Sequence, residues 1–279
     1  MFFRDWVVLL VDDEPDVLTM SKLLMRKFEV YGLPIKIYTA KSKAEAVDLL
    51  ANDLEVASSL AVAFIDVVME TDSAGLELCE YIRDDMGNRL SQLFVRTGQP
   101  GIATEMDVID RYDINGYFTK VETSQTKLYS VVKSSVRQYL LFGMSLATIG
   151  VLNDLIAASK SRDAILDAIH HLCGYNIELE DTPRWLIVDD EVLFEEEIDA
   201  ARGVETCAEM LSLEGIDLNP AGDKYVKGND GFQLIHITKK PTQAETTYLF
   251  QTRFSPPEHV VSLMHSVFSG LATAWRQSS

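Results

Sequence analysis

The sequence predicts an α/β protein: a doubly wound parallel sheet of five strands, then a long helix and a smaller α+β domain. Three observations lead to this class. Short apolar runs alternate with helical patterns over roughly the first 120 residues. One helical pattern then continues unusually far, and beyond it strands and helices no longer alternate.

The first part contains short runs that are apolar on both faces, as in a parallel sheet covered by helices. Such a sheet binds its ligands beyond the carboxyl ends of its strands. We expect strands at 7–11, 35–39, 60–65, 93–97 and 116–119, and helices at 18–28, 42–50 and 76–82.

Residues 124–158 show one long apolar stripe at intervals of three and four, which predicts a single helix. We expect this stripe to relay a signal and to form a homodimer interface; the alternative is that it packs against its own two domains. The stripe comprises Leu128, Val132, Val136, Tyr139, Leu140, Ala147, Val151 and Leu155.

The second half mixes helical and strand patterns. We expect helices at 162–173, 206–213 and 258–275, strands at 185–188, 231–237 and 246–254, and a loop at 220–231. The expected domains are 1–123, a connecting helix at 124–160, and 161–279.

The chain of 279 residues has a formal net charge of −18, which repels nucleic acid and anionic lipid. No apolar run reaches the ~18 to 20 residues needed to span a bilayer. Three widely spaced cysteines indicate neither a disulfide framework nor a zinc site. We therefore expect a cytoplasmic protein with no nucleic acid or membrane partner.

Polar residues stand at the ends of four predicted strands, and in a parallel sheet these strand ends meet at one edge. Asp12 and Asp13 follow the first strand, Asp66 follows the third, Thr97 ends the fourth and Lys120 follows the fifth. Phosphoryl transfer to a carboxylate needs such a set: a nucleophilic Asp, acids for a divalent cation, and a cation and a hydroxyl for the phosphoryl oxygens.

Taken together, these motifs resemble the receiver domain of bacterial response regulators, over about residues 5–140. The motifs are V-D-D-E at 11–14, F-I-D-V-V-M at 64–69, R-T-G at 96–98 and Y-F-T-K at 117–120. The resemblance implies a flavodoxin-like fold and a sensor histidine kinase or phosphotransfer protein as partner.

The resemblance also implies a role for each matching residue. Asp66 would be the phosphoacceptor, and Thr97 and Lys120 would grip the phosphoryl oxygens. Tyr117 would be the aromatic switch. Mg²⁺ would be held by Asp12, Asp13, Asp66 and the backbone carbonyl of Val68.

Two positions depart from the receiver pattern. Val121 stands where receivers usually have a proline after the lysine, which puts the geometry of that loop in doubt. The loop at 67–75 is one residue longer than usual, so metal access can differ.

Each of these motifs has a simpler reading when taken alone. An acidic pair is usually a solvated turn, and a single Asp can cap a helix. The same four residues, V-D-D-E, occur again at 188–191. We interpret Asp189 and Asp190 there as a turn between strands, not as part of a second receiver. None of the five histidines is followed by Asp, so the metal-phosphohydrolase pair is absent.

The runs V-R-T-G-Q-P-G at 95–101 and D-V-V-M-E-T-D-S-A-G-L at 66–76 are similar to one receiver subgroup. There the receiver precedes a domain of unassigned function, commonly followed by an HD-type cyclic-dinucleotide phosphodiesterase. The layout after residue 161 is similar to GAF-like domains.

We expect a two-component response regulator that is not itself an enzyme. The alternatives are the regulatory fragment of a cyclic-di-GMP phosphodiesterase, and a dual sensor whose C-terminal domain binds a small ligand.

Overall fold

The computed structural model describes residues 4–98, 105–120, 124–158, 161–174, 182–239 and 244–278. The chain divides into two compact units, Asp5–Gly143 and a second one built mainly from Met144–Ser279. Each unit is described by itself.

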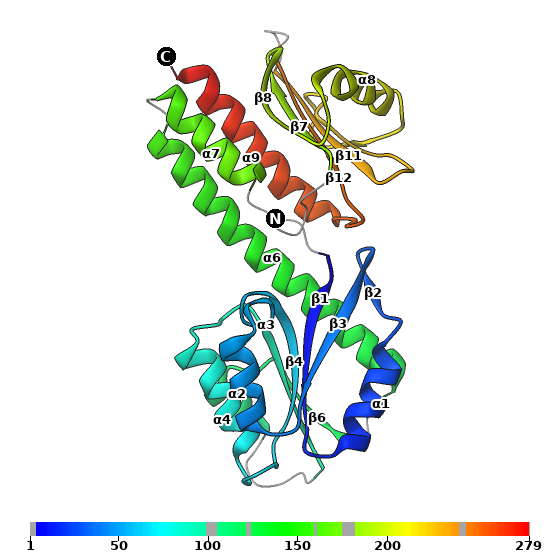
Figure 1. Cartoon of the computed structure of the whole chain (residues 1–279), viewed down its shortest axis with the longest axis vertical. Helices are drawn as coiled ribbons and strands as arrows, with labels where there is room; N and C mark the ends of the chain where they lie inside the picture. Colours follow the sequence, from blue (N-terminus) through cyan, green and yellow to red (C-terminus); the bar gives the residue numbers. More distant parts are fainter. Residues whose placement is uncertain are drawn as a thin grey trace. The chain divides into compact units, whose positions relative to one another are not determined.

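The first unit is a twisted, doubly wound α/β sheet, which confirms the predicted fold class (Figure 1). Its strand order is β2-β3-β1-β4-β5-β6, and all pairs are parallel except β2 with β3. The parallel strands are β1 (Trp6–Val11), β3 (Leu33–Ala40), β4 (Leu60–Asp66), β5 (Gln92–Thr97) and β6 (Gly116–Thr119).

The short edge strand β2 (Glu29–Val30) was not among the five expected strands. It forms because the chain reverses in a two-residue hairpin, in which Tyr31 and Gly32 both have positive φ, 53° and 78°. Two consecutive residues in that region make the tight turn that suits a β-hairpin.

Helices cover both faces of this sheet, with α2 and α4 on one face and α1 on the other (Figure 1). Ser42 caps α2 by accepting a hydrogen bond from the Glu45 amide at 3.1 Å. The helices are α1 (Pro15–Met25), α2 (Lys43–Asn52), α3 (Leu54–Ser59), α4 (Ala74–Glu80), which continues as a π-helical turn (Tyr81–Asp85), and α5 (Glu105–Tyr112).

Two of these helices, α3 and α5, were not expected from the apolar pattern because each is short. Asp53 ends α2 and at once starts α3, accepting hydrogen bonds from the amides of Glu55 and Val56 at 3.0 and 3.2 Å. A capping side chain, rather than an apolar stripe, therefore defines α3.

The helix α6 (Gln125–Ala158) runs for 34 residues, as the periodicity predicted. Most of the predicted stripe is buried within the chain, which favours packing within the chain, and the predicted homodimer stays a prediction. Buried members are Leu128, Val132, Val136, Tyr139, Leu140 and Leu155. These side chains lie on the side of the helix that is buried within the chain.

By length and composition alone, α6 could cross a membrane: an 18-residue window has a mean hydropathy of 1.7, and 22% of that window is buried. The sequence expectation of no sufficiently apolar segment is therefore wrong on this helix. Helices of water-soluble proteins meet the same criterion, so the predicted absence of a membrane partner stays a prediction.

The second unit contains an antiparallel sheet in the order β8-β7-β12-β11-β10-β9. Its strands are β7 (Arg184–Val188), β8 (Glu191–Glu196), β9 (Ile216–Asp217), β10 (Lys224–Lys227), β11 (Phe232–Lys239) and β12 (Ala244–Gln251). The predicted loop at 220–231 therefore contains a strand, β10, whose mixed polar composition hid it. The acid-rich β8 was missed for the same reason.

Helix α8 (Ala200–Leu211) packs on one face of this sheet, while α7 (Arg162–Gly174) and α9 (Glu258–Gln277) lie by the other. On the α8 face, Gly203 lies directly against the Trp185 ring, and an added Cβ would sit 2.8 Å from it. On the α9 face, Tyr248 stacks on Phe268 with ring centroids 4.2 Å apart. Both faces are thus apolar cores.

Candidate functional site

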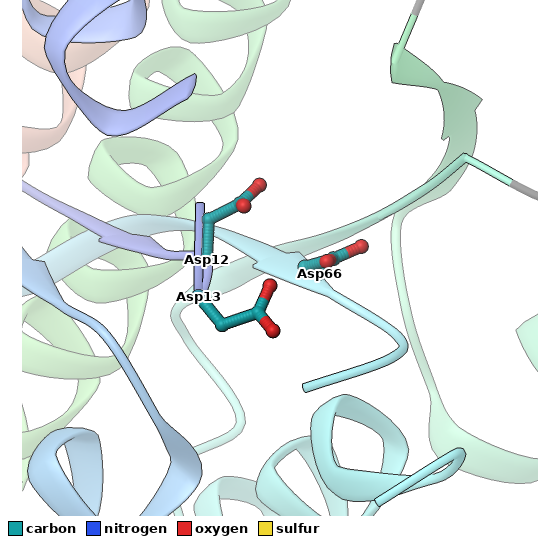
Figure 2. A group of neighbouring side chains, drawn as sticks. All are labelled: Asp12, Asp13 and Asp66. Atoms are coloured by element: carbon teal, nitrogen blue, oxygen red, sulfur yellow. The ribbon is translucent and has the colours of Figure 1, made fainter. Parts of the chain in front are cut away.

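Three carboxylates meet at the carboxyl edge of the parallel sheet. Asp12 and Asp13 follow β1, and Asp66 is the last residue of the neighbouring strand β4, in register through the Val11–Ile65 pair. One oxygen from each carboxylate lies within 4.8 Å of the other two, and Figure 2 shows the side chains converging. Asp12 and Asp66 are buried, whereas Asp13 is exposed.

Lys120 is the cation nearest Asp66. Its Nζ lies 2.9 Å from Asp66 Oδ2, 3.3 Å from Asp12 Oδ1 and 2.7 Å from Glu14 Oε1. Burial lowers the pKa of Lys120, but its hydrogen bonds to Glu14 and Asp66 outweigh this, and the net pKa is raised. Lys120 is therefore a permanent positive charge against the cluster.

Asp66 has a raised pKa. Burial is the largest cause; the hydrogen bond from Lys120 opposes it, and the charges of Asp12 and Asp13 add to it. A buried carboxylate that is costly to ionise by itself is stabilised strongly in its ionised form when a cation binds beside it.

Arg96 is a second cation of the site, and the sequence reading did not single it out. Its side chain is 3% exposed; Nη1 donates to Ser21 Oγ at 3.0 Å, and Nη2 lies 3.6 Å from Asp12 Oδ2. Within the described part of the chain, Arg96 Nε and Nη2 and Asp12 Oδ2 are buried without a hydrogen-bond partner. The position of Arg96 in the R-T-G run, at the end of a predicted strand, could have pointed to it as a site residue.

The remaining predicted residues lie around this edge. Thr97 is the buried last residue of β5, and Tyr117 lies half-buried in β6, opposite Val95 of β5. Val68 lies two residues beyond Asp66. The departure at Val121 and the Q-P-G at 99–101 fall outside the described residues.

The loop after Asp66 is closed by a tight backbone approach at Gly75. The Gly75 amide donates to the Val67 carbonyl at 3.0 Å. A Cβ added to Gly75 would lie 1.8 Å from the Asp66 carbonyl oxygen, a distance at which no side chain fits. Only glycine lets α4 begin this close to Asp66.

The residues present fit a small divalent cation. Hard cations such as Mg²⁺ take carboxylate oxygens as ligands and keep several waters, so three acids form half a coordination shell. Asp12 Oδ2 is a buried acceptor that lacks a hydrogen bond among the described residues, as expected of an oxygen awaiting a cation.

The second acidic pair has a different structure. Asp189 and Asp190 form the turn between β7 and β8, with φ of 49° and 67°, which confirms the predicted turn. Asp189 accepts two hydrogen bonds from Arg276, both at 2.6 Å. This pair is a structural turn.

Comparison with known proteins gives one curated relative, 3'3'-cGAMP-specific phosphodiesterase 2 of Vibrio cholerae, which is 39% identical over 134 residues. The match covers 48% of this chain and 25% of the relative, so the chain spans about a quarter of that protein. No family model matches the chain.

Solved structures of receiver domains match about half of the chain. One is the receiver domain of an HD domain-containing protein from Pseudomonas fluorescens, with 18% identity, 49% of this chain and 98% of that one covered, and a TM-score of 0.40. Another is a response regulator from Chloroflexus aurantiacus, with 22% identity, 48% and 98% covered, and a TM-score of 0.39.

The relative corrects one expectation. We predicted from the sequence that the chain is not an enzyme; that prediction is wrong, because the curated relative is named as a phosphodiesterase. The reasoning had relied on the lack of a recognisable catalytic motif in the second half, and the lack of a known motif does not exclude an activity.

Proposed function

We propose that residues 5–143 act as a phosphoacceptor receiver in which Asp66 takes a phosphoryl group from a sensor histidine kinase or phosphotransfer protein. The observation that carries the proposal is the convergence of Asp12, Asp13 and Asp66 within 4.8 Å, with Lys120 2.9 Å from Asp66. Local motifs alone do not produce this meeting of residues from three strand ends.

In the proposed reaction, an Asp66 oxygen attacks the phosphorus of a phosphohistidine. The P–N bond breaks, and the imidazole nitrogen that leaves takes up a proton from solvent. Asp12, Asp13, Asp66 and the Val68 carbonyl would hold Mg²⁺, which would supply positive charge for the phosphoryl oxygens. Lys120 holds the acidic site together beforehand and can transfer its hydrogen bond from Asp66 to a phosphoryl oxygen.

Thr97 would donate its hydroxyl to the phosphoryl group, and Tyr117 would then change rotamer. The signal would pass into α6, whose first turns are tied to this unit: Gln125 Nε2 donates to the Leu24 carbonyl at 3.0 Å and the Tyr129 hydroxyl to the Glu29 carbonyl at 3.3 Å. Phosphorylation would thus shift an existing equilibrium of this face.

We further propose that this unit and the second, GAF-like unit regulate a cyclic-dinucleotide phosphodiesterase. The relative named for 3'3'-cGAMP supports this class of output. The antiparallel sheet with helices on both faces supports the GAF-like layout of the second unit.

The test is intact mass after incubation with Mg²⁺ and acetyl phosphate. We expect the wild type to gain one phosphoryl group and Asp66→Asn to gain none. Asp190→Asn is the matched control, since it removes a carboxylate from the same V-D-D-E sequence outside the site, and it should behave as wild type. A phosphoryl gain in Asp66→Asn, or none in the wild type while Mg²⁺ still binds, would refute the proposed acceptor.

A further inference from the structure

The described part of the first unit contains two buried arginines, Arg83 and Arg96, and their surroundings differ. Arg83 donates to the backbone carbonyls of Asn88 and Asp113 at 2.8 and 3.0 Å. A longer contact of 3.4 Å joins it to the Asn115 side chain. A guanidinium that is bonded to carbonyls of two separate segments holds those segments together, so Arg83 has a structural role.

Arg96 makes fewer bonds of this kind. Its Nη1 donates to Ser21 Oγ at 3.0 Å, and its Nε and Nη2 have no hydrogen-bond acceptor in the part of the chain that the structure describes. Nη2 lies 3.6 Å from Asp12 Oδ2, which is longer than a normal hydrogen bond. Because an unpaired buried N–H group costs free energy, hydrogen bonding does not explain why an arginine is buried here. Its charge beside Asp12 is the remaining contribution.

The charge of Arg96 acts on the acidic cluster with little screening. The side chain is 3% exposed, and a guanidinium stays protonated in proteins. Burial lowers the pKa of Arg96, and the charges of Asp12 and Asp66 oppose this effect. Arg96 therefore interacts electrostatically with two of the three carboxylates of the site.

A fixed positive charge has opposite effects on the two species that this site would bind. The three carboxylates attract a divalent cation, whereas Arg96 beside Asp12 repels it. A phosphoryl group brings negative charge to Asp66, and Arg96 attracts that group. Since both interactions lie in a poorly solvated region, removing this one charge changes each affinity by about tenfold, and in opposite directions.

We propose that Arg96 is a positioning residue that weakens Mg²⁺ binding to the unphosphorylated site and favours the phosphoryl group on Asp66. It acts through its charge beside Asp12 and not as a metal ligand, and Ser21 of α1 orients its guanidinium. The inference rests on the proposed phosphoryl chemistry at Asp66.

The test is titration calorimetry of the full chain, first with Mg²⁺ and then with beryllofluoride, a stand-in for the phosphoryl group, at saturating Mg²⁺. Arg96→Met removes the charge and fills much of the same space. We expect it to bind Mg²⁺ on the order of 10-fold more tightly and beryllofluoride on the order of 10-fold more weakly than wild type. Arg96→Lys keeps the charge and should restore both affinities to near the wild-type values. A loosened fold would weaken both, so shifts of opposite sign report the charge itself.

Arg89→Met is the matched control: it removes the same charge from a side chain that is 60% exposed, and it should leave both affinities unchanged. Thermal unfolding reports whether each variant folds, and Arg96→Gln, which is neutral but can still donate to Ser21, repeats the test if Arg96→Met does not fold.

Unchanged or weaker Mg²⁺ binding by the folded neutral variant, or unchanged beryllofluoride binding, would overturn the role of Arg96. Loss of folding in both neutral variants would assign Arg96 a structural role and overturn the proposal as well. A wild type that binds neither Mg²⁺ nor beryllofluoride would instead refute the receiver chemistry at Asp66, and the role of Arg96 would fall with it.

Discussion

The four residues V-D-D-E occur twice in this chain, at 11–14 and 188–191, and they form two different structures. After β1 the chain leaves the sheet into α1, and the side chains of Asp12 and Asp13 meet Asp66 at the strand ends. After β7 the chain turns back at once, and Asp189 and Asp190 are used in the turn itself.

The difference lies in where the next strand runs. A parallel sheet must send each strand away through a crossover, so its carboxyl ends stay free and residues from distant segments collect at one edge. An antiparallel hairpin consumes the residues at the strand end in reversing the chain. The same acids therefore become a binding site in one unit and a turn in the other.

The largest expected contrast is in cation binding. We expect Asp12→Asn and Asp13→Asn each to weaken Mg²⁺ binding by roughly 10-fold or more, because each removes one of three charged ligands. Titration calorimetry with Mg²⁺ measures this directly. Asp189→Asn should leave the affinity unchanged; equal losses in both copies would mean that the first pair is not a ligand set.

The next prediction concerns Gly75, whose backbone lies against the Asp66 carbonyl near the first acidic pair. We expect Gly75→Ala to destabilise the fold by about 2–4 kcal/mol, because the new methyl group would overlap the Asp66 carbonyl and push α4 away. Gly150→Ala, where nothing lies within 4 Å, should instead stabilise α6 by about 1 kcal/mol. Urea unfolding measures both. A neutral Gly75→Ala would show that the turn before α4 relaxes freely.

A smaller effect comes from the ionisation of Asp66. Its pKa is raised in the folded protein, mainly by burial, so its contribution to stability is full below its unfolded pKa and is lost as pH rises through its folded pKa. Without metal, Asp66→Asn should therefore be more stable than wild type by on the order of 1 kcal/mol at pH 7, with the gain vanishing towards pH 3.

Thermal unfolding at several pH values, with a chelator present, checks this prediction. Saturating Mg²⁺ should reverse the order, because the cation binds the folded wild type and stabilises it by mass action. A pH-independent difference between the two proteins would contradict the assigned cause of the pKa shift. Asp190→Asn serves again as the matched control.

The smallest expected effects are on stability, from changes in the second acidic pair, Asp189 and Asp190. Asp190 has a φ of 67°, a region that glycine adopts without cost, so Asp190→Gly should stabilise the hairpin by a few tenths of a kcal/mol. Asp189→Ala should cost about 1 kcal/mol through loss of the paired hydrogen bonds from Arg276. Urea midpoints of both variants measure this, and neither change should alter phosphorylation.

Most strands of the first unit could be predicted from the sequence because they are apolar on both faces, and few structures other than a buried parallel strand have that pattern. Asp12, Asp66 and Lys120 were predicted to meet, since they share one sheet edge. The half-polar strands β8 and β10 escaped detection, because an antiparallel strand with one mixed face resembles a loop. Arg96 was missed because its importance comes from burial beside Asp12, which no local pattern reveals.

The amino-acid order by itself determined the α/β class of the first unit, the length of α6 and the turn at Asp189, because apolar periodicity and turn geometry are local. Tertiary structure alone decided which side of α6 is buried, that Arg96 lies against Asp12, and that Gly75 must have no side chain. Each of those depends on which surfaces of distant segments come within a few ångströms, and that is settled only when the chain packs.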